Sequence, residues 1–79
     1  MKTIFLYGTE YCHLCEQAEE LLRNLSDPHI RIEKVDISED DELMERYSLR
    51  IPVVRLEHNT NDLGWPFDSC GLQEYLEGS

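Results

Sequence analysis

The segment LYGTEYCHLCEQAEELL, residues 6–22, contains the change of periodicity that decides the fold. Its first two residues complete a near-continuous apolar run, Thr3–Tyr7, that is typical of a buried strand, and Gly8 ends the run. From Cys12 onward, apolar residues recur at helical spacing and charged residues fall on the other side. The apolar side holds Leu14, Ala18, Leu21, Leu22 and Leu25, and the charged side holds Glu16, Glu19, Glu20 and Arg23. A strand is therefore predicted to lead into a helix at Cys12.

The rest of the chain predicts five further elements. Ser26-Asp27-Pro28 should stop the first helix, because a proline disfavours helical backbone at the residue before it. The expected elements that follow are a strand over 30–37, a helix over 40–47, a strand over 51–56, a return strand over 63–65 and a last helix.

Capping residues and apolar faces can be assigned to the two later helices. Ser38 precedes an acidic cluster, which suits a helix N-terminus, so we expect Ser38 to cap the second helix. Asp68 or Ser69 can cap the last helix. The residues expected to face inward are Leu43, Met44 and Tyr47 on the second helix and Leu72, Tyr75 and Leu76 on the last.

The order βαβαββα predicts an α/β fold. Its first half requires two parallel strands joined by a right-handed crossover helix, and its second half supplies an antiparallel hairpin. We therefore expect a four-stranded mixed sheet with three helices, covering both of its faces. A chain of 79 residues is too short to build two cores, so residues 1–79 should form one domain.

Composition limits the function classes. Lysine and arginine number 7 and aspartate and glutamate number 17, which gives a net charge of −10. Such an acidic surface repels phosphate backbones and anionic lipids, so neither nucleic acid nor a membrane surface is expected as a partner. No secretion signal and no membrane-spanning stretch is recognised, and three cysteines do not suit a secreted disulfide framework. We expect a cytoplasmic monomer.

Cys12 and Cys15 form a C-x-x-C motif with three possible meanings. In a cytosolic protein with a βαβ pattern this spacing favours a redox pair. A zinc site would need two further ligands, for which Cys70, His13, His29 and His58 are candidates without forming a second paired motif. The third possibility is that both cysteines are buried packing residues.

The predicted position of Cys12 favours redox chemistry. A thiol at a helix N-terminus faces unpaired amides, which stabilise the thiolate that attacks disulfides. We expect Cys12 to attack and Cys15, one turn deeper, to resolve the intermediate. Glu10 and Glu16 oppose thiolate formation, so the pKa of Cys12 is expected near the ~7 of thioredoxin and below the ~8.5 of free cysteine.

Three segments together resemble the glutaredoxin-like proteins of the thioredoxin superfamily, in particular a group of small bacterial members. They are TEYCHLCEQAEELL (9–22), YSLRIPVVR (47–55) and LGWPFDSCGLQEYL (63–76). The resemblance implies the thioredoxin fold and a nucleophilic Cys12. It also implies a cis Ile51–Pro52 bond beside the cysteines, with the Ile51 backbone hydrogen-bonding a bound peptide or glutathione.

The chain departs from the glutaredoxin pattern at positions that bind glutathione. Glutaredoxins usually carry Pro-Tyr between the cysteines, where this chain has His13-Leu14. The Gly-Gly-x-Asp-Asp segment is replaced by residues 65–70, which lack the double glycine, and the basic residue that glutaredoxins often have just before the first cysteine is absent. Fold and thiol chemistry therefore transfer better than glutathione specificity. The candidate substrate-binding residues are Tyr11, His13, Ile51, Pro52, Asp68 and Ser69.

The sequence thus predicts a thiol–disulfide oxidoreductase that reduces protein disulfides or glutathione mixed disulfides. No bound cofactor or metal is expected, and glutathione is a possible co-substrate. The alternatives are a glutathione-dependent iron–sulfur cluster binding module and a non-enzymatic thioredoxin-fold adaptor. Outside the motif, Cys70 is expected to be buried or half-buried and Asp36 to serve a turn or cap. Trp65 and Phe67 should pack in the core, whereas His29 and His58 should be exposed.

Overall fold

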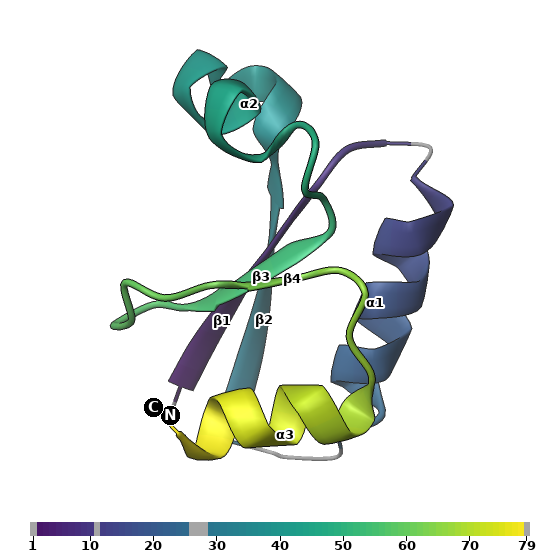
Figure 1. The fold of residues 1–79 in the computed structure, drawn as a ribbon, viewed down its shortest axis with the longest axis vertical. Helices are drawn as coiled ribbons and strands as arrows, with labels where there is room; N and C mark the ends of the chain where they lie inside the picture. The colour runs from purple at the N-terminus through teal and green to yellow at the C-terminus, as the bar shows by residue number, and fades with distance from the viewer. Residues whose placement is uncertain (1, 11, 26–28, 79) are drawn as a thin grey trace.

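The computed structural model describes residues 2–10, 12–25 and 29–78 and shows a βαβαββα chain (Figure 1). Its elements, in chain order, are β1 (Lys2–Gly8), α1 (His13–Arg23), β2 (Ile30–Asp36), the 3-10 helix η1 (Ile37–Glu39), α2 (Asp41–Tyr47), β3 (Val53–Leu56), β4 (Leu63–Gly64) and α3 (Ser69–Glu77). The predicted order of strands and helices is confirmed, with η1 as an addition.

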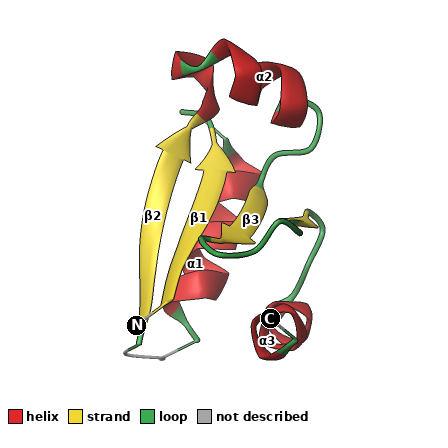
Figure 2. Cartoon of the chain, turned by 90° about the vertical axis from the view of Figure 1, so that its left-hand side faces the viewer, coloured by secondary structure: helices red, strands yellow, loops and turns green. Residues whose placement is uncertain are grey.

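The four strands form one mixed sheet in the order β2-β1-β3-β4. β1 runs parallel to β2 and antiparallel to β3, and β3 is antiparallel to β4 (Figure 2). Tyr7, near the end of β1, pairs with Val53, the first residue of β3. The end of β1, which leads to α1, and the start of β3 therefore lie at the same end of the sheet.

Alternation along β1 divides the core between the two sheet faces. Ile4 and Leu6 belong to the cluster formed with α1 and α3, which also contains Ala18, Leu22, Val54, Leu56 and Leu72. Tyr7 belongs to a second cluster on the α2 side, with Ile37, Tyr47 and Val53. The Tyr7 and Tyr47 rings stack with centroids 4.7 Å apart. The expectation of helices on both faces is confirmed.

The first helix differs from the sequence expectation in its end and in its buried face. α1 ends at Arg23, before the predicted stop at residues 26–28, which lie outside the described residues. Its buried residues are Cys15, Ala18 and Leu22, whereas Leu14 is 44% exposed. The expectation that Leu14 is part of the apolar face was wrong, because the buried face at this end passes through Cys15, about 100° further round the helix.

The second helix corrects two further expectations. Ser38 does not cap it: the Ser38 hydroxyl and amide both donate to Asp36, and the side chain of Asp40 caps α2 instead. The predicted turn or cap role of Asp36 is thus confirmed. Met44 is 37% exposed rather than buried, because α2 packs on the core through Leu43 and Tyr47.

The third helix follows the expectation closely. Asp68 caps α3 by accepting a hydrogen bond from the amide of Gly71 over 2.7 Å. Leu72 is buried, and Tyr75 and Leu76 pack against the same cluster. In the part of the chain that the structure describes, no helix has the length and apolar character needed to cross a membrane.

Candidate functional site

Cys12 lies at the junction between β1 and α1 and caps the helix. Its backbone is extended (φ −101°, ψ 103°), and its side chain accepts a hydrogen bond from an amide of the first helical turn. The donor is the amide of Cys15, 3.1 Å from the Cys12 sulfur. The prediction that Cys12 sits at the helix N-terminus is therefore confirmed, with its sulfur directed at a backbone amide.

Cys12 and Cys15 are joined by a disulfide, with their Cα atoms 5.2 Å apart. Cys12 is partly exposed, whereas Cys15 is 9% exposed and lies one turn deeper. An incoming disulfide can therefore reach Cys12 before Cys15. Because these cysteines bond to each other, their sulfurs are not metal ligands in this state. Among the described residues, no three His, Cys, Asp or Glu side chains are grouped so that they could hold a metal ion.

Gly8 allows the close approach of Cys15 to the end of β1. A β-carbon placed on Gly8 would lie 2.7 Å from the Cys15 sulfur and 3.2 Å from its β-carbon. Contacts below 3.0 Å require something to move. The glycine that ends β1 in the sequence is thus also the residue that leaves room for the disulfide.

The disulfide borders a cavity of about 330 Å³ between α1 and the ends of β1 and β2. Both cysteines line it, together with Gly8 at the end of β1 and the loop residues Thr9 and Glu10. The other lining residues come from three elements and are Leu6, Glu16, Glu19, Lys34, Val35 and Asp36. The wall opposite α1 is therefore supplied by β2, the parallel partner of β1.

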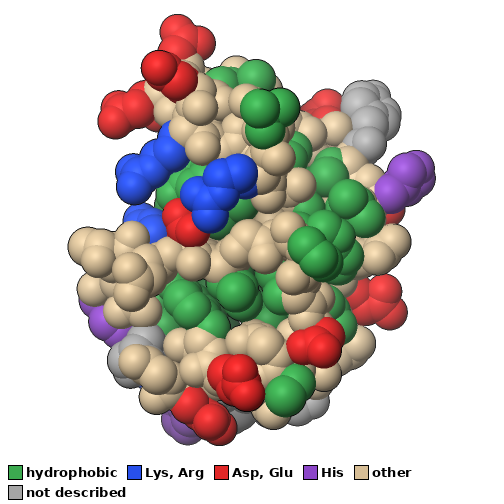
Figure 3. Space-filling model, in the orientation of Figure 1, with side chains coloured by type: hydrophobic (Ala, Val, Ile, Leu, Met, Phe, Trp, Pro, Cys, Tyr) green, Lys and Arg blue, Asp and Glu red, His purple; other side chains and the backbone are tan. Residues whose placement is uncertain are grey.

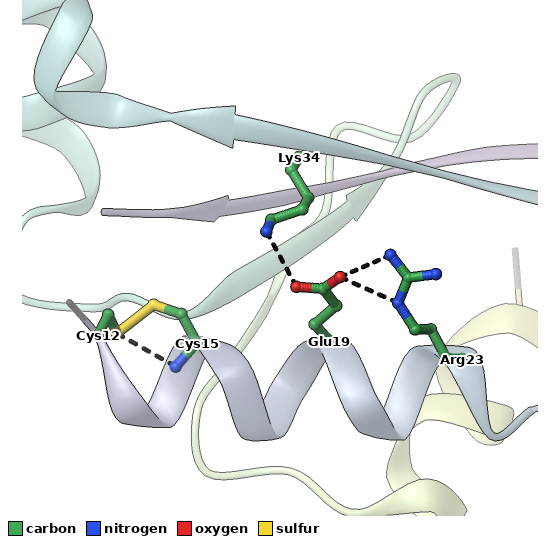
Figure 4. Close-up of polar contacts among 5 residues, drawn as sticks. All are labelled: Cys12, Cys15, Glu19, Arg23 and Lys34. Atoms are coloured by element: carbon green, nitrogen blue, oxygen red, sulfur yellow. Dashed lines mark hydrogen bonds and ion pairs between the residues drawn. A yellow bond between two sulfur atoms is a disulfide. The ribbon is translucent and has the colours of Figure 1, made fainter. Parts of the chain in front are cut away.

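Glu19 is the main feature of this cavity that the sequence analysis missed. It was assigned to the charged outer side of α1, but its side chain is only 19% exposed. One carboxylate oxygen lies 3.0 Å from Lys34 Nζ on β2, and the other accepts hydrogen bonds from Arg23 at 2.6 and 2.9 Å (Figure 4). Hydrogen bonds from Arg23 and Lys34 lower the pKa of Glu19 below its ordinary value of 4.5. The signal in the sequence was the spacing of four residues from Cys15 to Glu19, which places both on one helix face.

Of the predicted substrate-binding residues, His13 lies next to Cys12 as the first residue of α1. The His13 side chain is 93% exposed and 3.7 Å from Glu16. Pro52 is buried just before β3, and the Ile51–Pro52 bond is cis, as the resemblance implied. The Trp65–Pro66 bond is also cis, which was not predicted. The strand expected over 51–56 begins only at Val53.

Asp68 and Ser69 belong to the start of α3 and do not line the cavity. Tyr11 lies outside the described residues. A substrate role for any of these residues is still a prediction.

Other side chains singled out in the sequence behave mostly as expected. Trp65 and Phe67 are partly buried against the core, with their rings edge to face and centroids 5.1 Å apart. His29 and His58 are exposed. The expectation that Cys70 is buried or half-buried was wrong, because it is a free, exposed cysteine. Leu72 forms the buried face of α3, and Cys70 lies about 200° round the helix from it.

Comparisons with known proteins agree with this fold. The sequence profile of the glutaredoxin-like domain family (DUF836) matches residues 3–77. The X-ray structure of XcR50 from X. campestris is 36% identical, with a TM-score of 0.83 over 96% of this chain and 97% of that chain. Protein Ne2328 from Nitrosomonas europaea is 29% identical, with a TM-score of 0.80 over 94% of this chain and 89% of that chain. No curated protein matches the chain.

More distant structures show the fold alone. Desulfothioredoxin from Desulfovibrio vulgaris Hildenborough is 18% identical, with a TM-score of 0.74 over 99% of this chain and 81% of that chain. The predicted thioredoxin fold is therefore confirmed, and a close cysteine pair occupies the start of its first helix. Because the family profile covers nearly the whole sequence, this chain belongs to the glutaredoxin-like domain family.

Proposed function

We propose that this protein is a thiol–disulfide oxidoreductase in which Cys12 is the nucleophile and Cys15 the resolving cysteine. The observation that carries the proposal is the position of Cys12 at the start of α1, where its sulfur accepts a hydrogen bond from the Cys15 amide. Hydrogen bonds to an ionised acceptor are stronger than those to a neutral one, so this contact favours thiolate over thiol in the reduced protein.

The reaction proceeds in two exchanges. The Cys12 thiolate attacks one sulfur of the substrate disulfide, that S–S bond breaks, and the departing thiolate takes a proton from solvent. Cys15 then loses its proton to solvent and attacks the Cys12 sulfur, which closes the Cys12–Cys15 disulfide and releases the second substrate thiolate. Two electrons pass from the dithiol to the substrate, and the dithiol itself needs no bound cofactor.

The different burial of the two sulfurs supports this assignment. The more exposed Cys12 can meet a protein or glutathione mixed disulfide, while the buried Cys15 stays behind it and within bonding distance. Glutathione or a reductase would return the electrons. Equilibration with glutathione buffers separates these donors, because thioredoxin has a potential of about −270 mV and glutaredoxins about −200 to −230 mV.

Trapping the intermediate tests the proposal. All variants carry Cys70→Ser, which removes the exposed third thiol. Reduced Cys15→Ser protein mixed with hydroxyethyl disulfide should accumulate a species heavier by one mercaptoethanol, attached at Cys12 by peptide mapping. The matched Cys12→Ser variant should form little of this adduct and should lose disulfide reduction. Unchanged reduction by Cys12→Ser, or an adduct that forms equally well at Cys15, would overturn the proposal.

A further inference from the structure

The charges around the dithiol are predominantly acidic. Four carboxylates line the cavity beside Cys12 and Cys15, namely Glu10, Glu16, Glu19 and Asp36. Lys34 is the only lysine or arginine among the described lining residues. The Glu16 side chain is 75% exposed and belongs to the first turn of α1, and Glu10 is exposed in the loop before Cys12. A disulfide that approaches Cys12 therefore meets negative charge before it meets the sulfur.

Lys34, the one lysine or arginine among the described lining residues, is already paired with a carboxylate. Lys34 Nζ lies 3.0 Å from a Glu19 oxygen, and the same carboxylate binds Arg23. Figure 4 shows Glu19 on α1 turned toward Lys34 on β2, on the same side of the helix as the disulfide. An anionic substrate would have to compete with Glu19 for Lys34.

The other lysines and arginines of the described residues do not line the cavity. The sequence has 7 lysine and arginine residues. Arg46 and Arg50 lie over the Tyr47 ring, and Arg50 also binds Asp62. In Figure 3, Lys and Arg side chains of this face gather beside α2, whereas acidic, apolar and histidine side chains occupy the side at which α1 begins. The remaining cations are Arg23 at Glu19, Arg31 at Glu33, Arg55 at Tyr7 and Lys2 at the far end of β1.

We propose that the dithiol selects cationic disulfides, meaning disulfides flanked by lysine, arginine or other amines, over anionic ones such as oxidised glutathione. This inference rests on the proposed function and names its substrate class. Chemistry is the same for every substrate: the dithiol gives up two electrons and two protons, and the disulfide becomes two thiols. Selection arises because carboxylates on the approach attract a positively charged partner and repel a negative one.

Three small disulfides of similar size test the selection. They are cystamine, which is cationic, hydroxyethyl disulfide, which is neutral, and 3,3′-dithiodipropionate, which is anionic. Reduced Cys70→Ser protein is mixed with each at pH 7, quenched, alkylated and assayed by mass for loss of free thiols. Each rate is divided by the rate with dithiothreitol, an uncharged dithiol, which removes the intrinsic reactivity of the disulfide.

The normalised ratio of cystamine to dithiodipropionate should be about tenfold or more at ~0.01 M ionic strength. It should fall toward one at ~1 M, where the Debye length is only about 3 Å. Glu16→Gln should lower the low-salt ratio about twofold. The control is Glu77→Gln, which changes the net charge equally at the last residue of α3 and should leave the ratio unchanged.

A normalised ratio near or below one at low salt would overturn the inference. Equal effects of Glu77→Gln and Glu16→Gln on that ratio would also overturn it, because the preference would then come from the net charge of the protein. Neither result would touch the proposed function, provided that the neutral hydroxyethyl disulfide is reduced. If none of the three disulfides were reduced, the proposed function would be overturned instead.

Discussion

The amide of Cys15 donates a hydrogen bond to the sulfur of Cys12 over 3.1 Å, so the two cysteines are connected by the helix turn as well as by their disulfide. This contact ties the chemistry to the fold. The apolar strand β1 ends at Gly8, the chain turns, and α1 begins with Cys12 as its cap. The same turn therefore caps the helix and directs an amide at the sulfur.

The close packing of Gly8 against Cys15 gives a stability prediction. In Gly8→Ala the new methyl group would lie 2.7 Å from the Cys15 sulfur, so the strand or the disulfide must move. We expect the free energy of unfolding of the oxidised protein to fall by about 1–3 kcal/mol, measured by urea denaturation. Gly64→Ala is the control, because its methyl group would meet only Arg50 Nη2 at 3.5 Å. Equal effects of the two substitutions would contradict this account.

The Glu19 ion pairs predict a pH-dependent contribution to stability. Arg23 and Lys34 lower the pKa of Glu19 in the folded protein, so its carboxylate stabilises the fold above the ordinary value of 4.5. That contribution is lost as pH falls through the lowered folded pKa. We expect Glu19→Gln to reduce the free energy of unfolding by about 0.5–1 kcal/mol at pH 7, since Arg23 and Lys34 are largely solvated.

Thermal or urea unfolding at several pH values checks this prediction. The difference between wild type and Glu19→Gln should shrink as the pH falls below 4.5. Glu20→Gln removes the same charge from the next, exposed position of α1 and should have a smaller effect. A Glu19→Gln deficit that is independent of pH would show that the ion pairs are not its cause.

The cap of α3 is predicted to contribute to stability. Asp68 accepts a hydrogen bond from the Gly71 amide at 2.7 Å, and replacement of Asp68 by alanine removes this partner of the amide. We expect Asp68→Ala to lower the free energy of unfolding by about 1 kcal/mol. Ser69→Ala, at the exposed first residue of α3, should change it by less than about 0.5 kcal/mol. A larger loss of unfolding free energy for Ser69→Ala than for Asp68→Ala would show that Asp68 is not the cap.

The parts of the fold that the sequence predicted are those in which one local signal dominates. The change from an apolar run to helical spacing located β1 and α1, and the capping residue of α3 was among the two proposed. Cys12 was placed correctly because the end of a strand and the start of a helix both pointed to it. Local pattern and tertiary structure agree at these positions.

Predictions failed where tertiary contacts choose between equivalent local arrangements. Ser38 and Asp40 are both good caps, and the hydrogen bonds of Ser38 to Asp36 leave Asp40 to cap α2. Met44 neighbours the inward Leu43 on a helix of only seven residues, too short for periodicity to fix its orientation. Glu19 appeared to be a solvated charge because its partner Lys34 comes from β2, and helical periodicity carries no information about another element.

The proposed chemistry requires the first turn of α1 to stabilise the Cys12 sulfur as a thiolate. Its most direct test is the rate of Cys12 alkylation by iodoacetamide against pH, in reduced protein carrying Cys70→Ser and with Cys12 modification followed by mass. We expect a midpoint near ~7, below the ~8.5 of a free cysteine, because the amides outweigh Glu10 and Glu16. A midpoint at or above ~8.5 would contradict it, since the helix would then give the thiolate no net stabilisation.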